Sequence, residues 1–572
     1  MAEPESGPNG AIEAVVGRLV EGAAAHALRE PAARSALAIR TARSLASVAE
    51  AWASVAVEIK HASTVGPCGL AEEIATGPLA TLRLLLVTAR ALADIGRGTL
   101  PTLAAPPRLS HPGSGGPGGA GGPGSRIEID LLPAFGPGSR SAWLQSGSLH
   151  DRAIFGGHRA TVRCTNPGGV EVFLRSWAEE IRERTREGGV ALVLGAGNVT
   201  GLAPADCICQ IFEHGRAVLL KLHPLYAPLE SLLREGLAPL IEERLLEIVV
   251  GGADLARSAI GSDRIGHVHL TGGAAAFEAI RPLVRSSLTC ELGNVTPWIV
   301  VPGRYSPAQI AAQADMLAAS IINNTSFNCI ATKLVITCRG WDQREAFLER
   351  LAARLAAAPA RPGWYPGAIA SWSEATGMPE PADGRLPWTL RADVDPVREP
   401  SWCEREWFVP VAAEIPLDAA DVDAFCGAAL DLVRRLPGSL AASVTAADDL
   451  APHAAKRVDQ LVDHIACGVV GRNCWSALAY AMGNVPWGGF PGGTLDAPRS
   501  GIGYVHDPLL LPLVHNSLVR GPLAPSITPA WLPWRRGGVT LARGVVEMYA
   551  EIAAGRSGML PLVRMLPTVL MP

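Results

Sequence analysis

Residues 190–222 read VALVLGAGNVTGLAPADCICQIFEHGRAVLLKL, and their pattern decides the fold of the central part of the chain. One apolar run ends in glycines, and a second, AVLLKL, follows after an intervening segment. Two further runs, LEIVVGG at 246–252 and IGHVHLTGG at 265–273, continue this pattern with helix-like segments between them. Short apolar strands that alternate with helices predict a parallel sheet covered by helices on both faces.

Ligands of such sheets bind at the carboxyl ends of the strands. In this sequence one lysine and several glycines fall at those ends: Gly195, Gly197, Lys221, Gly251, Gly252, Gly272 and Gly273. Their spacing differs from the dinucleotide fingerprint GxGxxG, so it does not predict an ordinary Rossmann fold. We therefore expect a ligand site at this edge of the sheet, and the glycines alone do not assign the ligand.

The flanking regions have different patterns. Residues from about 11 to 96 are rich in Ala, Leu, Arg and Glu with apolar residues at helical spacing, which predicts amphipathic helices. Residues 106–126 are dominated by Gly and Pro and predict a flexible loop. RIEIDLL at 126–132 and ATVRC at 160–164 predict strands, and residues 170–186 predict a helix.

A second α/β region extends from Trp298 to about Ala466. Its predicted strands include WIVV and KLVIT, and REAFLERLAARLAA is a predicted helix. Beyond about Pro522 the chain is rich in Pro and Trp and contains one helical stretch, TLARGVVEMYAEIAAG. This last segment either packs on the body or mediates assembly, and the sequence leaves both open. The length of 572 residues allows two or three domains.

The composition narrows the class of protein. With 48% apolar and 18% charged residues the chain is typical of a globular enzyme, and a net charge of -4 argues against general nucleic-acid binding. The first ten residues lack the pattern of a secretory signal, and no apolar run is long enough for a membrane span. The eleven cysteines include no CxxC pair, and the spacing of Cys207 and Cys209 fits neither zinc nor redox motifs. We expect a cytoplasmic protein with reduced thiols.

Four residues are candidates for chemistry, although each has a simpler explanation when taken alone. Cys329 precedes a predicted strand, and a lone cysteine is more often an inert small hydrophobe than a nucleophile. Glu291 alone would be a surface or capping carboxylate. Asn198 would be a turn residue, and Lys221 a charge at the end of a strand. The order of the segments that carry these residues is more informative than any one of them.

These segments share one order with a known family: GNVTGLAP at 197–204, GRAVLLKLHPLYAP at 215–228, HVHLTGG at 267–273, CELGNVTPWIVV at 290–301, NTSFNC at 324–329, EREWFVPV at 404–411, GVVGRNC at 468–474 and VPWGGF at 485–490. The order resembles the aldehyde dehydrogenase superfamily over roughly residues 30–510, most strongly between Leu194 and Cys329. CELGN is similar to the family's Glu-Leu-Gly-Gly motif, NTSFNC to Asn-x-Gly-Gln-x-Cys, and EREWFVPV to Glu-Ile-Phe-Gly-Pro-Val. The resemblance implies two α/β domains with parallel-rich sheets, N-terminal helices and a C-terminal extension.

The resemblance also divides the chain. Residues 1–105 are expected to form the N-terminal helical part of the cofactor domain, and 106–126 the Gly/Pro-rich loop. Residues 127–295 are expected to form the nicotinamide cofactor-binding domain, and 296–490 the catalytic domain with the nucleophilic cysteine. Residues 491–572 are expected to form an oligomerisation segment and an extension. By analogy with relatives, a homodimer or homotetramer is expected.

Roles for single residues follow from the same resemblance. Cys329 is expected to attack an aldehyde and to form a thiohemiacetal and then a thioester. The Asn198 side-chain amide and the Cys329 backbone N–H would hold the oxyanion, and Glu291 would be the general base for hydrolysis. No metal is expected. NAD or NADP would be held by residues along the glycine-rich edge and in EREWFVPV: Lys221, Gly252, Gly272, Gly273, Leu292, Glu406 and Phe408.

The sequence departs from the family around the nucleophile. Ser326 occupies the glycine position of the cysteine motif, and the bulkier Phe327 and Asn328 precede Cys329. These residues are expected to reshape the floor of the site. Asn294 replaces the second glycine after the glutamate and is expected to restrict the movement of Glu291.

Two departures bear on the cofactor. Gly273 replaces the serine of Thr-Gly-Ser and removes one hydroxyl, although backbone amides can still bind phosphate. Pro224 stands three residues after Lys221, where NAD-preferring relatives often have a glutamate that binds the adenosine ribose. Without that carboxylate the 2′-phosphate of NADP would not be repelled, and His223 could help to bind it. The sequence therefore leaves NAD and NADP open.

Other functions stay open at this stage. A CoA-linked relative would release the thioester to CoA, or reduce an acyl-CoA, with the same residues. A catalytically silent scaffold protein is a further alternative, motivated by the changes around Cys329. His267 and His269 lie two apart on a predicted strand without an evident third metal ligand, and a structural role is favoured. The apolar composition hints at a hydrophobic aldehyde, and the sequence does not identify it.

Overall fold

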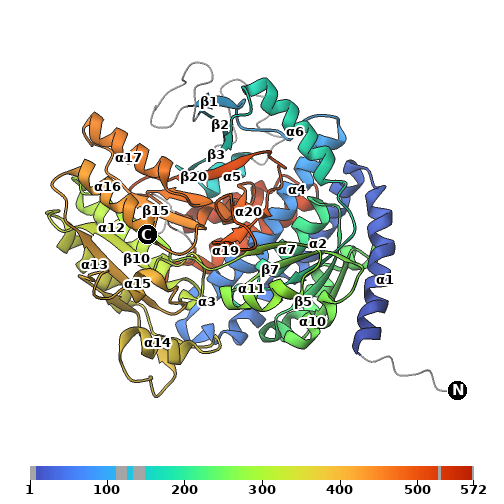
Figure 1. The fold of residues 1–572 in the computed structure, drawn as a ribbon, viewed down its shortest axis with the longest axis horizontal. Coiled ribbons are helices and arrows are strands. Elements are labelled where there is room, and N and C mark those ends of the chain that lie inside the picture. Colours follow the sequence, from blue (N-terminus) through green and yellow to red (C-terminus); the bar gives the residue numbers. More distant parts are fainter. Residues whose placement is uncertain (1–7, 111–124, 133–147, 526–527, 529, 570–572) are drawn as a thin grey trace.

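The computed structural model describes residues 8–110, 125–132, 148–525, 528 and 530–569. Figure 1 shows strands with helices packed around them, which confirms the predicted mixed α/β architecture. The two large sheets of the described residues have six and ten strands. Among the described residues, no helix is long and apolar enough to cross a membrane.

The six-stranded sheet is formed by the run of strands predicted from residues 190–291. Its order is β18-β8-β7-β4-β5-β6, and the five strands from β8 to β6 are parallel. The short strand β18 (Gly501–Ile502) pairs antiparallel with β8. The strand β4 is buried along its whole length, as expected for a strand with helices on both faces. The parallel strands are β4 (Val190–Leu194), β5 (Ala217–Leu222), β6 (Leu246–Val250), β7 (Ile265–Thr271) and β8 (Ser287–Glu291).

Helices connect these strands and cover the sheet (Figure 1). LESLLREGLAPLIEERL at 229–245, one of the helix-like segments between the strands, forms two short helices. The break lies at Leu237, two residues before Pro239, because a proline inside a helix removes a backbone donor and clashes with the preceding turn. The connecting helices are α7 (Leu202–Phe212), α8 (Glu230–Gly236), α9 (Ala238–Glu242), α10 (Ala253–Ile260) and α11 (Ala274–Ile280).

The N-terminal helices form as predicted and pack against the six-stranded sheet and its helices. Helix α2 begins at a proline, which fits the first turn of a helix because the donor that it lacks has no partner there. A π-helical turn, Ala75–Leu79, joins two of these helices and contains Pro78. The N-terminal helices are α1 (Pro8–Ala27), α2 (Pro31–Ile59), α3 (Pro67–Ile74) and α4 (Ala80–Gly96).

The ten-stranded sheet has the order β1-β2-β3-β20-β16-β15-β9-β10-β14-β13. The strands from β20 to β13 are parallel to one another, whereas the pairs β1–β2, β2–β3 and β3–β20 are antiparallel. Its strands are β1 (Arg108–Ser110), β2 (Arg126–Leu132), β3 (Arg159–Thr165), β9 (Pro297–Val300), β10 (Leu334–Cys338), β13 (Thr389–Arg391), β14 (Val411–Leu417), β15 (Ala441–Thr445), β16 (Val469–Arg472) and β20 (Val514–Arg520).

The pairing of strands differs from the expected loop at 106–126 and from the expected cofactor domain at 127–295. The strand β1 lies inside 106–126, which was expected to be a loop, and Arg108 forms ion pairs with Glu128 and Asp130 of β2. The strands β2 and β3 lie within the range expected for the cofactor domain, yet β3 pairs with β20 in the other sheet. Cross-strand pairing, which local sequence does not encode, decides which sheet a strand joins.

Helices also flank the ten-stranded sheet (Figure 1). Helix α12 leads toward Cys329 and begins at a capping box in which Ser306 and Gln309 bond to each other's backbone N–H. The helices of this part are α5 (Ser148–Ile154), α6 (Val170–Arg184), α12 (Pro307–Ile322), α13 (Arg344–Ala357), α14 (Ala368–Thr376), α15 (Ser401–Glu404), α16 (Val422–Val433), α17 (Pro452–His464) and α18 (Leu478–Met482). Short strands of two or three residues form small pairs: β11 (Arg361–Pro362) with β12 (Arg385–Leu386), and β17 (Trp487–Gly488) with β19 (Tyr504–His506).

The C-terminal segment ends in helices α19 (Gly538–Ala553) and α20 (Met559–Val569), which pack against each other. Helix α19 also packs against α2 and α3 from the other end of the chain. Tyr549 of α19 accepts a hydrogen bond of 2.7 Å from Arg83 of α4. Arg43 of α2 donates a hydrogen bond of 2.6 Å to the Ala553 carbonyl at the end of α19. The segment therefore packs on the body, which was one of the two options left open by the sequence.

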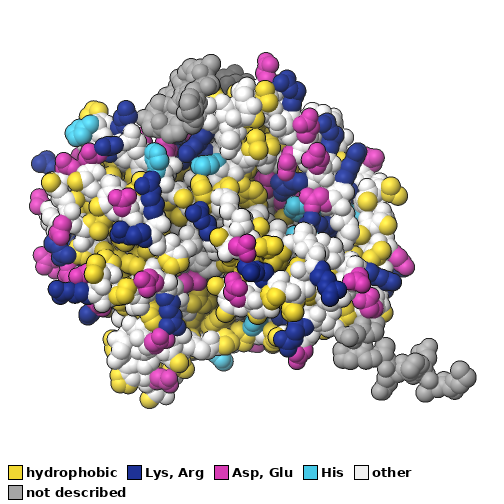
Figure 2. All heavy atoms as spheres, in the orientation of Figure 1, with side chains coloured by type: hydrophobic (Ala, Val, Ile, Leu, Met, Phe, Trp, Pro, Cys, Tyr) yellow, Lys and Arg dark blue, Asp and Glu magenta, His cyan; other side chains and the backbone are white. Residues whose placement is uncertain are grey.

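The surface in Figure 2 carries basic and acidic side chains that are interspersed with hydrophobic ones. No continuous basic area appears on that face, in keeping with the small net charge of the chain.

Candidate active site

The loop that carries Cys329 has an unusual backbone. After α12 ends at Ile322, three consecutive residues that are not glycine adopt left-handed conformations: Asn324 at φ 52°, Thr325 at φ 57° and Ser326 at φ 63°. A left-handed conformation costs such residues roughly 1–2 kcal/mol each. Ser326 thus keeps the conformation that glycine adopts easily, and surrounding contacts must hold the turn.

Buried charged groups provide contacts that hold the turn. Asn324 accepts a hydrogen bond of 3.0 Å from Lys60 Nζ, and its backbone N–H donates to Glu72. Lys60 pairs with Glu73 at 2.9 Å, and Arg361 pairs with Glu72 at 2.9 Å. All four charged side chains are at most 5% exposed. Lys60 at the end of α2 and Glu72 of α3 therefore hold residues 323–329, the cysteine loop, in place.

Removing Lys60 tests this support. We expect Lys60→Met to lower the free energy of unfolding by about 3–5 kcal/mol, because Glu73 would keep a buried position without its partner. The matched control is Arg18→Met, which removes a pair with Glu247 that is half-exposed on the arginine side and should change stability by less than about 1 kcal/mol. Chemical denaturation measures both variants. Equal losses in the two would contradict the assigned role of Lys60.

A second buried lysine, Lys333, contacts the same turn. Lys333 Nζ donates to Ser326 Oγ at 2.7 Å, to the Ser326 carbonyl at 3.3 Å and to the Val409 carbonyl at 2.9 Å. Burial lowers the pKa of Lys333, and the carboxylate of Glu406 opposes this effect. Lys333 therefore joins the cysteine loop to the segment that carries Glu406 and Phe408.

The Cys329 thiol faces a carboxylate. Its Sγ donates a hydrogen bond of 3.4 Å to Glu291 Oε1, and the indole N–H of Trp487 donates 3.0 Å to Glu291 Oε2. Burial raises the pKa of Glu291 to about 7, and the nearby charge of Asp206 adds to this shift. Burial and the charge of Glu291 raise the pKa of the Cys329 thiol well above its usual value. The free site therefore holds a thiol next to a potential base.

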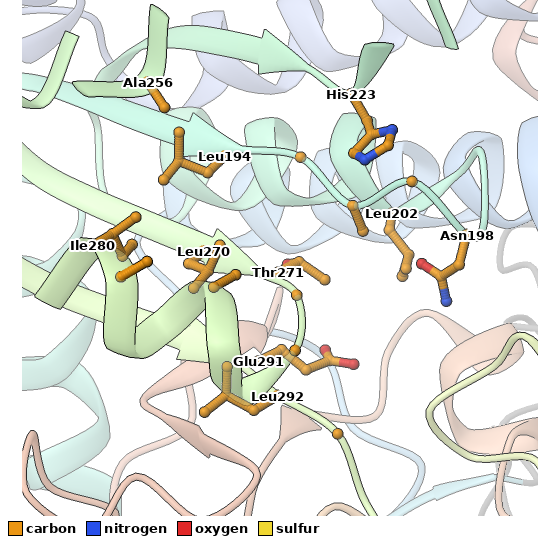
Figure 3. A pocket seen from close by; sticks show the side chains of 18 of the residues that line it. Leu194, Asn198, Leu202, His223, Ala256, Leu270, Thr271, Ile280, Glu291 and Leu292 are labelled. Carbon is orange, nitrogen blue, oxygen red and sulfur yellow. The ribbon is translucent and has the colours of Figure 1, made fainter. Parts of the chain in front are cut away.

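Asn198 joins the same group. Its side-chain N–H donates a hydrogen bond of 3.2 Å to the Phe327 carbonyl, and its backbone carbonyl accepts a hydrogen bond of 2.8 Å from the Asn324 side chain. Asn198, Glu291 and Cys329 all line one pocket with a volume of about 540 Å³. Figure 3 shows Asn198 and Glu291 pointing into the same open space from opposite sides. The three residues predicted as catalytic are thus brought together.

The remaining predicted residues lie along the same pocket with one exception. Lys221, Gly272, Gly273, Leu292, Glu406 and Phe408 line it, whereas Gly252 does not and instead precedes α10, whose Ala253 does. The lining residues that sequence reasoning did not assign to the pocket include Leu194, Arg257, Ile280, Leu283 and Tyr365.

Several features of the pocket fit a dinucleotide. Gly273 leaves open space above the backbone, since a Cβ on it would meet no atom within 4 Å. A Cβ on Gly293 would lie 1.8 Å from Glu406 Oε2, so glycine is needed there for that carboxylate to reach its position. Glu406 Oε1 is buried and has no hydrogen-bond partner among the described residues, so it can accept a ligand hydroxyl.

Two of the departures from the family pattern, Phe327 and Asn294, make their contacts with groups other than the thiol. Phe327 is fully buried among Trp364, Tyr365 and Phe408, with ring centroids 5.2–6.1 Å apart. The side-chain amide of Asn294 donates two hydrogen bonds of 2.9 Å, one to Thr296 Oγ1 and one to the Ala441 carbonyl. Phe327 therefore extends an aromatic wall toward the pocket residues Tyr365 and Phe408.

One group outside the pocket brings potential metal ligands together. Ligand atoms of Cys209, Glu213 and His214 lie within 4.8 Å of one another. Glu213, however, already pairs with Arg184 at 3.0 Å and accepts the backbone N–H of Asp507. This ion pair accounts for the group without a metal. His267 and His269 are buried and bond to hydroxyls.

Comparison with solved structures identifies the fold. The chain is similar to an NAD-dependent aldehyde dehydrogenase from Sinorhizobium meliloti, with 16% identity, coverage of 90% of this chain and 87% of that one, and a TM-score of 0.55. The chain has the aldehyde dehydrogenase fold. A second protein with this fold is an aldehyde dehydrogenase from Pseudomonas aeruginosa, with 15% identity, 91% and 90% coverage and a TM-score of 0.56.

A third structure with the aldehyde dehydrogenase fold is the NADP-dependent glyceraldehyde-3-phosphate dehydrogenase from Bacillus halodurans, complexed with NADP. It is 16% identical, with coverage of 89% of this chain and 91% of that one and a TM-score of 0.57. No protein-family model matches the sequence, and no curated protein matches it. The likeness therefore lies in the fold, while the sequence has diverged far from these structures.

Proposed function

We propose that the chain is a nicotinamide-dependent aldehyde dehydrogenase that oxidises an aldehyde to a carboxylic acid through a thioester on Cys329. The observation that supports this most directly is the convergence of Cys329, Glu291 and Asn198 on one pocket, with the thiol 3.4 Å from the carboxylate. A thiol, a base and an amide donor are the groups that this reaction needs. The substrate is proposed to be a small-molecule aldehyde.

The chain's own residues would act in a fixed order. Glu291 takes the thiol proton, and Cys329 Sγ forms a bond to the carbonyl carbon, whose oxygen becomes an oxyanion. The Cys329 backbone N–H and the second N–H of the Asn198 amide hold that oxyanion, and one such donor lowers the barrier by roughly 3 kcal/mol. Glu291 then releases the thiol proton from the pocket and is ionised again, and after a hydride has left the carbon, water attacks the thioester while Glu291 accepts its proton. The C–S bond then breaks and frees the acid.

The proposed cofactor is NAD or NADP, which when bound would accept the hydride. Lys221 at the end of β5 and the open glycines after β7 would hold the nucleotide. Glu406, with its unpartnered oxygen, would bind ribose, and Phe408 would contact the nicotinamide ring. Arg257 and His223 also line the pocket and would tolerate a 2′-phosphate, in line with the neutral Pro224.

The proposal predicts how activity depends on pH. Because burial raises the pKa of Glu291 to about 7, its carboxylate is mostly protonated below pH 7 and mostly ionised above it. Only the ionised form accepts a proton, so we expect kcat to rise about tenfold from pH 6 to pH 8. Steady-state rates in a constant-ionic-strength buffer series measure the profile. A rate that falls over this range would contradict the assignment of Glu291 as the base.

A substrate panel tests the reaction itself. The purified full chain is assayed with short, long and aromatic aldehydes and either NAD or NADP, and the absorbance of the reduced cofactor is followed. Acyl-CoAs with reduced cofactor form the second arm, which distinguishes a CoA-linked enzyme from one that uses water. Aldehyde-dependent reduction without CoA supports the proposal. No reduction with any aldehyde, alongside binding of the cofactor, would instead favour a silent scaffold protein.

Assembly as a homodimer or homotetramer is part of the proposal, in a soluble protein of the cytoplasm. Light scattering of the purified chain measures the assembly state.

A further inference from the structure

A row of polar side chains runs along one face of the neighbouring strands β7 and β8 and ends at Glu291. Alternate residues of a strand point to the same face, so residues two apart form successive rungs across the pair. The parallel register places three such pairs opposite each other: His267 with Ser287, His269 with Thr289 and Thr271 with Glu291. We call the side chains that lead to Glu291, together with one from helix α7, the polar ladder: Ser287, His267, Thr289, His269, Thr271 and Asp206.

The outer half of the polar ladder begins at the surface. Ser287 is exposed, and its Oγ lies 2.8 Å from Nδ1 of His267, whose side chain is buried. The other ring nitrogen of His267, Nε2, lies 2.9 Å from Thr289 Oγ1. A continuous hydrogen-bonded path therefore leads from solvent into the sheet.

The inner half continues the path to the pocket. Thr289 Oγ1 also lies 2.8 Å from Nδ1 of His269, and Nε2 of that ring lies 3.3 Å from Thr271 Oγ1. The Thr271 hydroxyl donates a hydrogen bond of 2.9 Å to Asp206 Oδ2, while Asp206 Oδ1 lies 3.6 Å from His269 Nε2. Thr271 lines the pocket beside Glu291, and Figure 3 shows both at the ends of adjoining strands.

The chemistry of the polar ladder allows two complete hydrogen-bond arrangements, because a hydroxyl and a neutral imidazole each donate one proton and accept another. With Asp206 ionised, every donor points inward, from Ser287 toward Asp206. With Asp206 protonated, every donor points outward. Burial lowers the pKa of His267 to about 2, so its ring is neutral as both arrangements require.

Passage of one proton converts the outward arrangement into the inward one. Asp206 gives its proton to His269 Nε2, each following member hands on the proton that it carried, and Ser287 releases one to solvent. Every bond that breaks is replaced by an equivalent bond, and no ring or hydroxyl keeps a charge. One proton enters at Asp206 and one leaves at Ser287.

We propose that the polar ladder carries protons between Glu291 and solvent during turnover, an inference that rests on the proposed function. Glu291 is 1% exposed, yet oxidation of an aldehyde with water releases protons that must leave the pocket. A proton taken up by Glu291 from thiol or water passes to Asp206, either through Thr271, its neighbour in the strand register, or directly. The polar ladder then delivers a proton to solvent. Its members act through Glu291, so they are positioning residues.

Thr289→Val tests the polar ladder at its centre, because valine keeps the shape of threonine but lacks the hydroxyl that joins the two histidines. We expect kcat to fall about tenfold, less than for loss of the base itself, and the solvent deuterium isotope effect on kcat to increase. Thr289→Ser, which keeps the hydroxyl, should restore both values. The matched control is Thr161→Val, a buried strand threonine in the other sheet whose hydroxyl bonds to Asp130.

Thermal denaturation separates a structural effect from a relay effect. If Thr289→Val and Thr161→Val lose stability alike and their kcat values fall alike, with the isotope effect unchanged, the polar ladder is only structural and the proposal is overturned. An unchanged kcat in Thr289→Val would overturn it as well.

An NMR measurement tests the coupling without any turnover. In protein labelled with 15N-histidine, Asp206→Asn should change the ring tautomers of both His269 and His267, although only His269 is next to Asp206. In the Asp206→Asn, Thr289→Val double variant only His269 should respond. A His267 ring that does not respond in the single variant overturns the proposal. Failure of the wild type to oxidise any aldehyde would instead refute the proposed function, and the NMR result would still decide whether the polar ladder is coupled.

Discussion

Replacing Cys329 with alanine is expected to lower aldehyde-dependent kcat/KM by about 10³-fold or more. The Cys329 sulfur is the one that faces Glu291 in the pocket, and without it no covalent adduct forms from which a hydride can leave. Cofactor binding should persist, because the proposed nucleotide contacts lie along the strand ends and at Glu406. Steady-state assays and fluorescence titration with the reduced cofactor measure the two properties.

The control for this variant is Cys403→Ala. Cys403 is also a partly buried free thiol, but it does not line the pocket. Its loss should leave kcat/KM within about twofold of the wild type, within the scatter expected for a site with no shared contact. Mass spectrometry of the wild type after mixing with aldehyde and oxidised cofactor should find an acyl group on the peptide that contains Cys329. An adduct on another cysteine would remove Cys329 from the mechanism.

Glu291→Gln is expected to lower kcat by about 10²- to 10⁴-fold. Glutamine has nearly the same shape but accepts no proton at neutral pH, so neither the thiol nor the attacking water loses its proton readily. Because the thioester then persists, added hydroxylamine, which cleaves thioesters directly, should raise the rate of product release. Quenched-flow measurement of hydroxamate formation reports this rescue.

The matched control is Glu404→Gln, an exposed glutamate on α15 that should leave kcat unchanged. The rise of kcat with pH should also disappear in Glu291→Gln, because the group that titrates near pH 7 is gone. A Glu291→Gln enzyme that keeps the wild-type rate and pH profile would assign the base to another residue.

Much of the fold could be predicted because short-range patterns of apolar residues in the sequence determine which segments form strands and helices. The apolar runs at β4, β5, β6 and β7 are short, are separated by helices and end in glycines or a lysine, so both the parallel sheet and its ligand edge were predictable. The N-terminal helices follow equally from their apolar spacing. Pairing of β2 and β3 with the other sheet was not predictable, since it depends on contacts with β20, which lies about 350 residues later.

The candidate site divides in the same way. Cys329, Glu291 and Asn198 were predictable because they stand in ordered segments that resemble a family. Lys60 and Lys333 were not, because nothing in their local sequence shows that they are buried beneath the cysteine loop. Trp487 lay in a recognised segment, but only its indole contact with Glu291 gives it a role. For the polar ladder a sequence signal existed, since H-x-H-x-T and S-x-T-x-E alternate at the period of a strand.

The packing of α19 against α2 and α3 has a consequence for biosynthesis. Helix α3 carries Glu72 and Glu73, and its contacts with α19 involve residues that the ribosome makes more than 450 positions later. The faces of α2 and α3 that α19 covers therefore stay exposed until residues 538–553 have been translated. A nascent chain halted before Gly538 should expose this apolar surface to chaperones.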